Sequence, residues 1–435
     1  MHILWLSPVL PFPPTDGNRM RNFYLIKNLS EEHEISLIHF YTTDDTPNND
    51  NPIYRYCKNI EGIEIRRKKE ESVFRLVDKI WNELFGVSTF CSYGNRKEMR
   101  DRVSSFCKKN KIDIIVTISP WMGEFAAHIK NIPKILDNQN VEALLLNGIF
   151  KAEKRIKTKL AKYLDYQAMA RYENRIIKFF DMMTVVSSGD KKNFVNNGFD
   201  DDFIKVVPNG VQISEKEFAY SQNGSSRLIF CGGMSYPPNV EGVNYFMTDI
   251  YPKIKKILPQ LKVSFVGKLP HPDVVHWQSE HVEITGFVDD VLPYYRKSAV
   301  SIVPLKTGSG TRLKILESMA LGVPIVSTSL GSSGLSVKNN ENIILADDPD
   351  SFAKGVLNLI KNPRLSYAIS KNARKLVESR YDWFMIAKGF NRILLDVVNR
   401  RKQKDITIQP RIYTAWLSPQ PKKDKNKLLA ADGRR

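Results

Sequence analysis

The sequence has little cysteine and no long hydrophobic run. Its 435 residues include four cysteines, Cys57, Cys91, Cys107 and Cys231. None of them forms a Cys-x-x-Cys pair, so neither a disulfide framework nor a zinc site is predicted. No segment approaches the roughly 18–20 uninterrupted apolar residues of a membrane-spanning helix, and the apolar run at 2–6 is too short for a signal peptide. We therefore expect a cytoplasmic protein that would meet a membrane only at its inner surface.

The chain also has fewer acidic than basic residues. The chain has 47 Asp and Glu residues against 65 Lys and Arg residues, which gives a formal net charge of +18. Such an excess favours polyanionic partners, namely nucleic acid, anionic lipid or phosphorylated small molecules. The sequence lacks zinc-ligand spacing, a helix-turn-helix pattern and the aromatic signature of RNA-binding domains. Specific nucleic-acid recognition is therefore not expected.

Short apolar segments alternate with longer helical patterns along most of the chain. This alternation is typical of βαβ units and parallel sheets, and so of an α/β fold. Two cores are expected, because single cores stop growing at roughly 250–300 residues. A turn-rich stretch at 208–226 separates two series of predicted strands. The first series lies near 2–7, 34–40, 112–118, 133–136, 182–186 and 204–207, and the second near 228–231, 262–266, 282–285, 299–303, 323–326 and 342–345.

The most informative segment is 303–327 (VPLKTGSGTRLKILESMALGVPIVS), which predicts a strand, a glycine-rich loop, a helix and a second strand. Gly308 and Gly310 would let backbone N–H groups approach a phosphate, and Thr311 is the predicted N-cap of the helix. Arg312 and Lys314 then fall in the first turn, where a positive charge opposes the helix dipole unless an anion compensates it. The spacing therefore favours a bound phosphate, although many such units bind nothing.

Glu317 lies further along the same predicted helix. A carboxylate there can accept hydrogen bonds from the two hydroxyl groups of a ribose. A salt bridge to Lys314, three residues before it, is the structural alternative.

Several segments together resemble GT-B glycosyltransferases of family 4. They are the segment at 303–327 and those at 229–240 (IFCGGMSYPPNV), 285–290 (TGFVDD), 136–142 (LDNQNVE) and 185–187 (VVS). Their order and spacing hold over roughly residues 1–390, and matches in one order across two domains rarely arise by chance.

The resemblance implies two Rossmann-like domains that face a central cleft. Residues 1–210 would form the acceptor domain and residues 225–380 the nucleotide-sugar donor domain. Residues 381–400 would form a C-terminal helix that packs back on the N-terminal domain. The basic stretch 401–435 has no sustained period and is expected to be a disordered tail.

The resemblance also implies the donor-binding residues. In the family, a Glu-x7-Glu pair frames the donor, and Glu317 matches the second Glu. The first falls on Ser309, which is not acidic, and the usual Arg and Lys pair after the first strand of the donor domain is absent. Arg312 and Lys314 are therefore the predicted catalytic residues, which would stabilise the leaving diphosphate. The predicted donor-binding residues are Gly232, Gly233, Gly286, Phe287, Val288, Gly308, Ser309, Gly310, Thr311 and Glu317.

By the same resemblance, the chain would transfer a sugar with retention from a nucleotide-diphosphate donor to a glycan or lipid-linked acceptor, without a metal or other cofactor. The predicted acceptor-binding residues are Asp16, Gly17, Asn18 and Asp137. Amphipathic segments at 74–85 and 150–162 suggest contact with an anionic membrane surface, with core packing as the alternative. A GT-B nucleotide-sugar epimerase, a phosphorylase and a non-catalytic basic binding protein remain as other interpretations.

Overall fold

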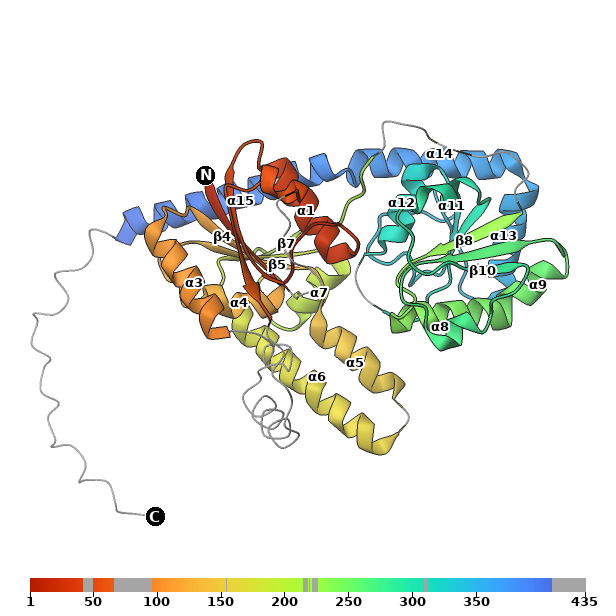
Figure 1. Cartoon of the computed structure of the whole chain (residues 1–435), viewed down its shortest axis with the longest axis horizontal. Helices are drawn as coiled ribbons and strands as arrows, with labels where there is room; N and C mark the ends of the chain where they lie inside the picture. Colours follow the sequence, from red (N-terminus) through yellow and green to blue (C-terminus); the bar gives the residue numbers. More distant parts are fainter. Residues whose placement is uncertain are drawn as a thin grey trace, which may run out of the picture.

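The structure, a computed structural model, describes residues 1–41, 50–65, 96–153, 155–213, 218, 220, 226–308 and 311–408. It consists of two parallel sheets, each with helices around it, side by side in the view of Figure 1. Both sheets are wound in the order expected of an α/β protein, with the first strand of each half near the middle. The predicted α/β class is confirmed.

The first sheet has seven strands in the order β3-β2-β1-β4-β5-β6-β7, all of them parallel. The strands are β1 (His2–Ser7), β2 (Glu34–Tyr41), β3 (Asn59–Glu64), β4 (Ile114–Ile118), β5 (Lys134–Asn138), β6 (Met182–Val185) and β7 (Ile204–Val206). The helices of this half are α1 (Gly17–Leu29), α3 (Arg96–Lys109), α4 (Ser119–Ala127), α5 (Glu142–Ala152), α6 (Ile156–Ile177) and α7 (Ser188–Asn196).

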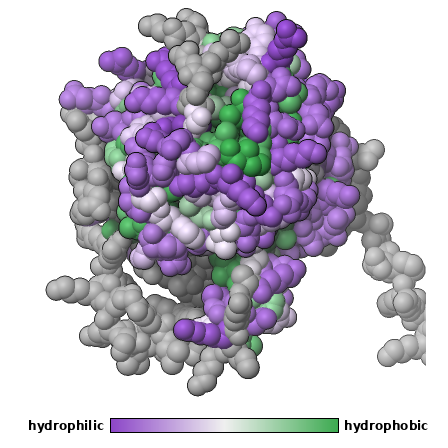
Figure 2. Space-filling model, turned by 90° about the vertical axis from the view of Figure 1, so that its right-hand side faces the viewer, coloured by the Kyte–Doolittle hydropathy of each residue, from purple (hydrophilic) through white to green (hydrophobic). Residues whose placement is uncertain are grey.

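The second sheet has six parallel strands in the order β10-β9-β8-β11-β12-β13. The strands are β8 (Arg227–Cys231), β9 (Lys262–Val266), β10 (Val282–Ile284), β11 (Val300–Val303), β12 (Ile325–Ser327) and β13 (Ile344–Leu345). The helices are α8 (Pro237–Tyr245), α9 (Tyr251–Lys255), α10 (Pro272–Val275), α11 (Leu292–Arg296), α12 (Leu313–Leu321), α13 (Pro349–Lys361) and α14 (Pro363–Arg380). Figure 2 shows the outer end of this half, which is largely hydrophilic apart from a compact hydrophobic patch.

The last helix, α15 (Trp383–Ile408), runs back along the first half (Figure 1). Its buried side chains, including Trp383 and Phe390, join the core formed by β1 and α1, and Trp383 stacks on Tyr24 with ring centroids 5.6 Å apart. The helix continues eight residues past the predicted end at residue 400, so the prediction of a disordered tail is wrong for 401–408. The buried side chains of Leu394, Val397 and Val398 anchor it to the core, and the Arg401 Nη2 donates to the Lys130 carbonyl at 3.1 Å.

The α5–α6 pair projects from the first half (Figure 1). The two helices pack along each other, and Phe150 and Tyr163 meet with ring centroids 5.3 Å apart. Large apolar side chains are exposed on this pair, with Leu160 62% exposed and Leu164 40% exposed. Among the described helices, none is both long and apolar enough to cross a membrane.

Candidate active site

The helix α12 begins where the glycine-rich loop ends, at the boundary between the two halves. Its N-cap is Arg312, with φ −85° and ψ 92°, and no side chain caps its first turn. The prediction of Thr311 as N-cap is therefore wrong, because the helical turn starts one residue later, at Leu313. Helix N–H groups without a side-chain cap are ready donors for an anion. Ser309 and Gly310, two predicted donor-binding residues, lie outside the described residues.

Lys314 is a partly buried cation in this first turn. Its Nζ donates to the Asn239 Oδ1 at 2.9 Å and lies 3.8 Å from the centre of the Phe230 ring. Burial lowers the pKa of the ammonium to about 7, although the Cys231 and Glu317 charges oppose this shift. An ammonium whose hydrogen-bond partner is a neutral amide is costly to keep charged, and a bound diphosphate would supply the missing negative charge.

Glu317 lies one turn further along α12 and is held by a buried tyrosine. Tyr295 is fully buried on α11, and its hydroxyl donates to the Lys314 carbonyl at 3.4 Å and also interacts with the Glu317 carboxylate. Burial raises the pKa of Glu317, while Lys314 and the Tyr295 hydroxyl lower it. Burial raises the pKa of Tyr24 on α1, and the Glu317 charge adds to this shift.

Arg312 brings a second cation to the same boundary. The residue is only 8% exposed, and burial lowers the pKa of its guanidinium. The negative forms of Tyr236, which follows β8, and of Asp190, on α7 of the first half, oppose this shift. Asp190 is itself fixed by the Ser187 hydroxyl, which donates to its Oδ2 at 2.6 Å. Arg312 and Lys314, the two predicted catalytic residues, thus lie together, with groups from both halves around them.

The turn after β8 brings backbone close to these cations. Gly232 has φ +156°, and a Cβ there would lie 2.9 Å from both the Lys314 Nζ and the Asn239 Nδ2. A Cβ on Gly233 would meet nothing within 4 Å, so this turn opens into free space. Gly308 has φ +107°, and its Cβ would lie 2.9 Å from the Arg312 Nη2. Only glycine lets the backbone approach both cations in these conformations.

The third predicted donor segment follows β10. Gly286 has φ +69°, and the space beside it is empty within 4 Å. Phe287 is 62% exposed, whereas Val288 packs against the small core around Ile229 and Val266. An exposed aromatic ring beside open backbone is suited to stacking on a flat base.

The predicted acceptor residues Asp16, Gly17 and Asn18 form the start of α1, directly opposite α12. Asp16 caps α1 by accepting from the Arg19 backbone N–H at 3.0 Å. A Cβ on Gly17 would lie 3.3 Å from the Leu313 Cδ1 of the second half. The Asn18 side chain accepts a hydrogen bond from the Asn22 Nδ2 at 3.0 Å.

Asp137 does not face the boundary, so its predicted role in acceptor binding is wrong. It is fully buried, and both its oxygens are bound by Arg21, at 2.8 Å from Nε and 2.7 Å from Nη2. The Thr184 hydroxyl donates to the same carboxylate at 2.6 Å. A carboxylate with this set of donors is a structural group that holds α1 on the sheet.

Sequence reasoning missed Tyr295, Asn239, Asp190 and Glu142 as members of this site. Each comes from a different element, and no spacing in the sequence connects them to Lys314. Glu142 follows β5 and lies close enough to Tyr236 for its charge to raise the pKa of that tyrosine.

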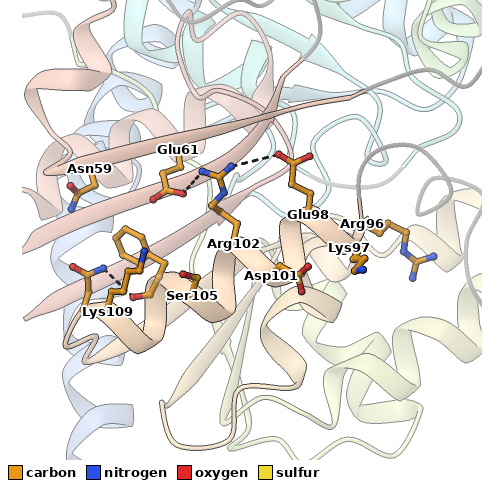
Figure 3. Close-up of a pocket in the computed structure, with 11 residues that line it drawn as sticks. Asn59, Glu61, Arg96, Lys97, Glu98, Asp101, Arg102, Ser105 and Lys109 are labelled. Carbon is orange, nitrogen blue, oxygen red and sulfur yellow. Dashed lines mark hydrogen bonds and ion pairs between the residues drawn. The ribbon is translucent and has the colours of Figure 1, made fainter.

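A large hollow elsewhere is separate from this site. It has a volume of about 1100 Å³ and lies between the edge strand β3 and α3 (Figure 3). Three of its charges are paired within it, since Arg102 lies 3.4 Å from Glu61 and 3.6 Å from Glu98. Among the residues that the structure describes, no group of three or more His, Cys, Asp or Glu side chains could hold a metal ion.

Comparison with known proteins finds a match over the part of the chain that contains Arg312, Lys314 and Glu317. Residues 225–362 match the sequence family described as glycosyl transferases group 1. An uncharacterized 44.6 kDa protein in the cps region of Klebsiella pneumoniae is 23% identical over 87% of this chain and 96% of its own length. An uncharacterized glycosyltransferase of Methanocaldococcus jannaschii is 21% identical over 58% of this chain and 67% of its own length.

Solved structures share the whole architecture. Sucrose-phosphate synthase from Thermosynechococcus elongatus superposes with a TM-score of 0.66 at 16% identity, over 92% of this chain and 100% of that one. Anabaena HepE in complex with UDP gives a TM-score of 0.62 at 14% identity, over 91% of this chain and 100% of that one. The family match shows that residues 225–362 are similar to the group 1 glycosyltransferases, and the solved structures show that the chain has the GT-B fold.

Proposed function

We propose that the chain transfers a sugar with retention from a nucleoside diphosphate donor to a glycan or lipid-linked acceptor. The observation that carries this proposal is a pair of cations, the buried Arg312 and the partly buried Lys314, at a helix start that the side chain of its N-cap residue leaves uncapped. Positive charges fixed in advance beside open N–H groups stabilise negative charge as it develops on a leaving group.

In the proposed reaction the donor diphosphate lies against the start of α12 and the turn at Gly232 and Gly233. The bond between the anomeric carbon and the diphosphate oxygen breaks, and a bond from that carbon to the acceptor oxygen forms on the same face. The acceptor proton passes to the departing diphosphate oxygen, so no separate protein base is required. Lys314 and Arg312 stabilise the charge on the diphosphate.

Glu317 would bind the ribose hydroxyls, held in place by the Tyr295 hydroxyl. The backbone at Gly286 and Val288, with the exposed Phe287 ring, would lie beside the base. The start of α1 at 16–18, across from Leu313, would contact the acceptor.

The chemistry of similar proteins supports the classes of donor and acceptor. HepE was solved with UDP and with UDP-glucose, and TarM of S. aureus with UDP and α-GlcNAc-glycerol. A relative in a cps region of Klebsiella pneumoniae is in keeping with a role in surface polysaccharide synthesis. These features belong to those proteins and serve here as guides to the ligands that should be tried.

The end of the α5–α6 pair is the proposed contact with an anionic membrane. Exposed Leu160, Tyr163 and Leu164 lie there beside the exposed cations Lys151 and Arg155. Apolar side chains flanked by basic ones are typical of helices at a membrane interface. The other segment predicted to behave in this way, 74–85, lies outside the described residues.

The transfer proposal is tested with a panel of UDP-, GDP- and ADP-sugars. The correct nucleotide sugar at about 100 times its dissociation constant should stabilise the chain by roughly 2.7 kcal/mol. Transfer from that donor should give a product whose anomeric configuration, read by NMR, equals that of the donor. An inverted product would contradict the retaining mechanism, and release of an epimerised nucleotide sugar without any acceptor would favour an epimerase instead.

The membrane contact is tested by sedimentation with phosphatidylcholine vesicles that contain or lack phosphatidylglycerol. The wild-type chain should bind the anionic vesicles, and Leu160→Ser/Leu164→Ser should bind them less. The variant Lys108→Glu/Lys109→Glu, on α3, lowers the net charge by four away from this surface and should retain binding. Equal binding by the Leu160 variant and the wild-type chain would contradict the proposal.

A further inference from the structure

Glu142 lies at the boundary between the two halves, in a place where parallel sheets carry ligands. The strand β5 ends at Asn138, and α5 begins at Glu142, so the residue stands beyond the carboxyl end of a strand in the middle of the first sheet. Ligands of doubly wound α/β domains bind along this edge. The strands β1 and β6, on either side of β5 in the sheet, lead to residues that touch the second half, since a Cβ on Gly17 would lie 3.3 Å from the Leu313 Cδ1 and a Cβ on Gly334 would lie 2.9 Å from the Ser187 Cβ. Burial raises the pKa of Tyr236 in the second half, and the Glu142 charge adds to this shift.

Tyr236 connects Glu142 with the donor-binding cations. This tyrosine follows the turn at Gly232 and Gly233, and its charge acts on Arg312. Glu142 of the acceptor half and Arg312 of the donor half are therefore both near the same tyrosine. A sugar whose diphosphate sits at Arg312 and Lys314 would extend toward this region.

The Glu142 carboxylate is not needed to cap the start of α5. The start of α5 is already capped by Glu173 on α6, whose Oε1 and Oε2 accept from the backbone N–H groups of Glu142 and Ala143 at 3.0 and 3.1 Å. The Glu142 carboxylate is therefore not needed as an acceptor for these N–H groups, and burial raises the pKa of Glu173 itself to about 8. Burial raises the pKa of Glu142 to about 7, while the Asn140 side chain lowers it by hydrogen bonding.

We propose that the Glu142 carboxylate binds the acceptor hydroxyl and orients its oxygen toward the anomeric carbon of the donor. This inference rests on the proposed function and deepens it. The acceptor O–H donates to Glu142 before transfer, and during transfer its proton passes to the departing diphosphate oxygen. Glu142 accepts a hydrogen bond and keeps no proton, so the reaction balances as written above.

The proposal has a consequence for the pH dependence of transfer. The groups that face Glu142 are Glu173 on α6, Asn140 before α5 and Tyr236 across the boundary. The ionised Glu142 carboxylate only accepts hydrogen bonds, whereas the protonated form can also donate one. The kcat/KM for transfer to the acceptor substrate should therefore rise as the pH increases through about 7. Lys314 titrates in the same range, but it loses charge as the pH rises and so acts in the opposite direction.

The experiment measures UDP release from a UDP-sugar with and without octyl glucoside and octyl galactoside as acceptor probes. Glu142→Ala should lower acceptor-dependent kcat/KM by about 100-fold, and Glu142→Gln by about 10-fold with loss of the rise near pH 7. Affinity for UDP should change by less than about twofold, because UDP binding does not involve the acceptor. Glu153→Gln, at the far end of the same helix, is the matched control and should behave as the wild-type chain.

The outcomes separate this inference from the function on which it rests. Absence of any acceptor-dependent rate in the wild-type chain, together with no UDP binding, would count against the proposed function. Normal transfer by Glu142→Ala would overturn the role of Glu142 alone. Equal losses of UDP affinity and transfer would also overturn it, since Glu142 would then support the fold or the donor site.

Discussion

Arg21 in the first half and Lys314 in the second half are two positive charges with different kinds of hydrogen-bond partner. In the first half, the Arg21 guanidinium is fully buried and bound at two points by Asp137, and its Nη1 also donates to the Pro208 carbonyl and the Asn209 side chain at 3.0 Å each. In the second half, the Lys314 ammonium donates to a neutral amide and rests on an aromatic ring. The Arg21 guanidinium therefore has a matched carboxylate, whereas Lys314 has none in hydrogen-bond contact and burial lowers its pKa to about 7.

This difference distinguishes a charge that supports the fold from a charge that can bind a ligand. A buried cation with a matched carboxylate is part of the fold, and it is expensive to disturb. A buried cation that the fold leaves partly uncompensated lowers stability in the free protein and becomes favourable when an anion arrives. The prediction that placed Asp137 among the acceptor-binding residues fails for this reason, because strand position alone cannot tell which charges are already satisfied.

The largest expected effect is on stability, from breaking the satisfied pair. Asp137→Ala leaves the Arg21 charge buried without its partner, which should cost about 3–5 kcal/mol in the unfolding of the first half. Urea unfolding followed by tryptophan fluorescence measures this, with Trp5 in the same core. The double variant Arg21→Met/Asp137→Leu should recover much of the loss. A loss below about 1 kcal/mol for Asp137→Ala would remove the contrast between the two sites.

The next effect is on ligand binding, from removing the uncompensated charge. Lys314→Met should leave the fold at least as stable as the wild type near neutral pH and weaken UDP binding by about 1.5–3 kcal/mol, the range of charged hydrogen bonds. Isothermal calorimetry measures the affinity. Unchanged affinity would show that Lys314 is not at the diphosphate site.

The same cation should also make binding depend on pH. In the free protein Lys314 is mostly neutral at pH 8, because its pKa is lowered from 10.5 to about 7. Diphosphate favours the charged form, so UDP binding should take up a fraction of a proton at pH 8 and almost none at pH 6. The number of protons taken up on UDP binding is measured by calorimetry in buffers of different ionisation enthalpy. The same uptake in Lys314→Met would assign the proton to another group.

A smaller effect is expected at Glu317. Glu317→Ala removes the carboxylate that would bind the ribose, and it should weaken binding of UDP by about 1–3 kcal/mol. Affinity for inorganic pyrophosphate, which has no ribose, should be unaffected and serves as the control ligand. Parallel losses for UDP and pyrophosphate would indicate a general disturbance of α12.

The smallest effect is expected at Tyr295. Tyr295→Phe keeps the buried ring and removes only the hydroxyl that holds Glu317, so UDP affinity should fall by about 0.5–1.5 kcal/mol. In a double-mutant cycle with Glu317→Ala, the two losses should not add, since the tyrosine would act through the glutamate. Full additivity would place Tyr295 outside this interaction.

Most of the sheet framework could be predicted from the sequence, because buried parallel strands are short apolar runs. Strands predicted at 2–7, 34–40 and 262–266 agree with β1, β2 and β9 to within one residue. The strand β3 was missed, since its sequence NIEGIE contains two acids and a glycine, and it lies at the edge of the sheet with only Ile63 buried. An edge strand need not be apolar on both faces, so its pattern is weak.

The candidate site could be predicted only in part. The segment 303–327 placed Arg312, Lys314 and Glu317 on one loop and helix, where local spacing carries the information. Tyr295, Asn239 and Glu142 could not be found in this way, because they meet these residues only through the packing of separate elements. The N-cap was misplaced because a Thr is the better cap in isolation, whereas the chain here enters the helix one residue later.

A crystal structure of the chain with UDP tests the central claim most directly. The diphosphate should lie at the start of α12, in contact with Lys314 and the turn at Gly232 and Gly233, with the ribose against Glu317. A diphosphate bound elsewhere, with the Lys314 ammonium still on the Asn239 amide and out of its reach, would contradict the account.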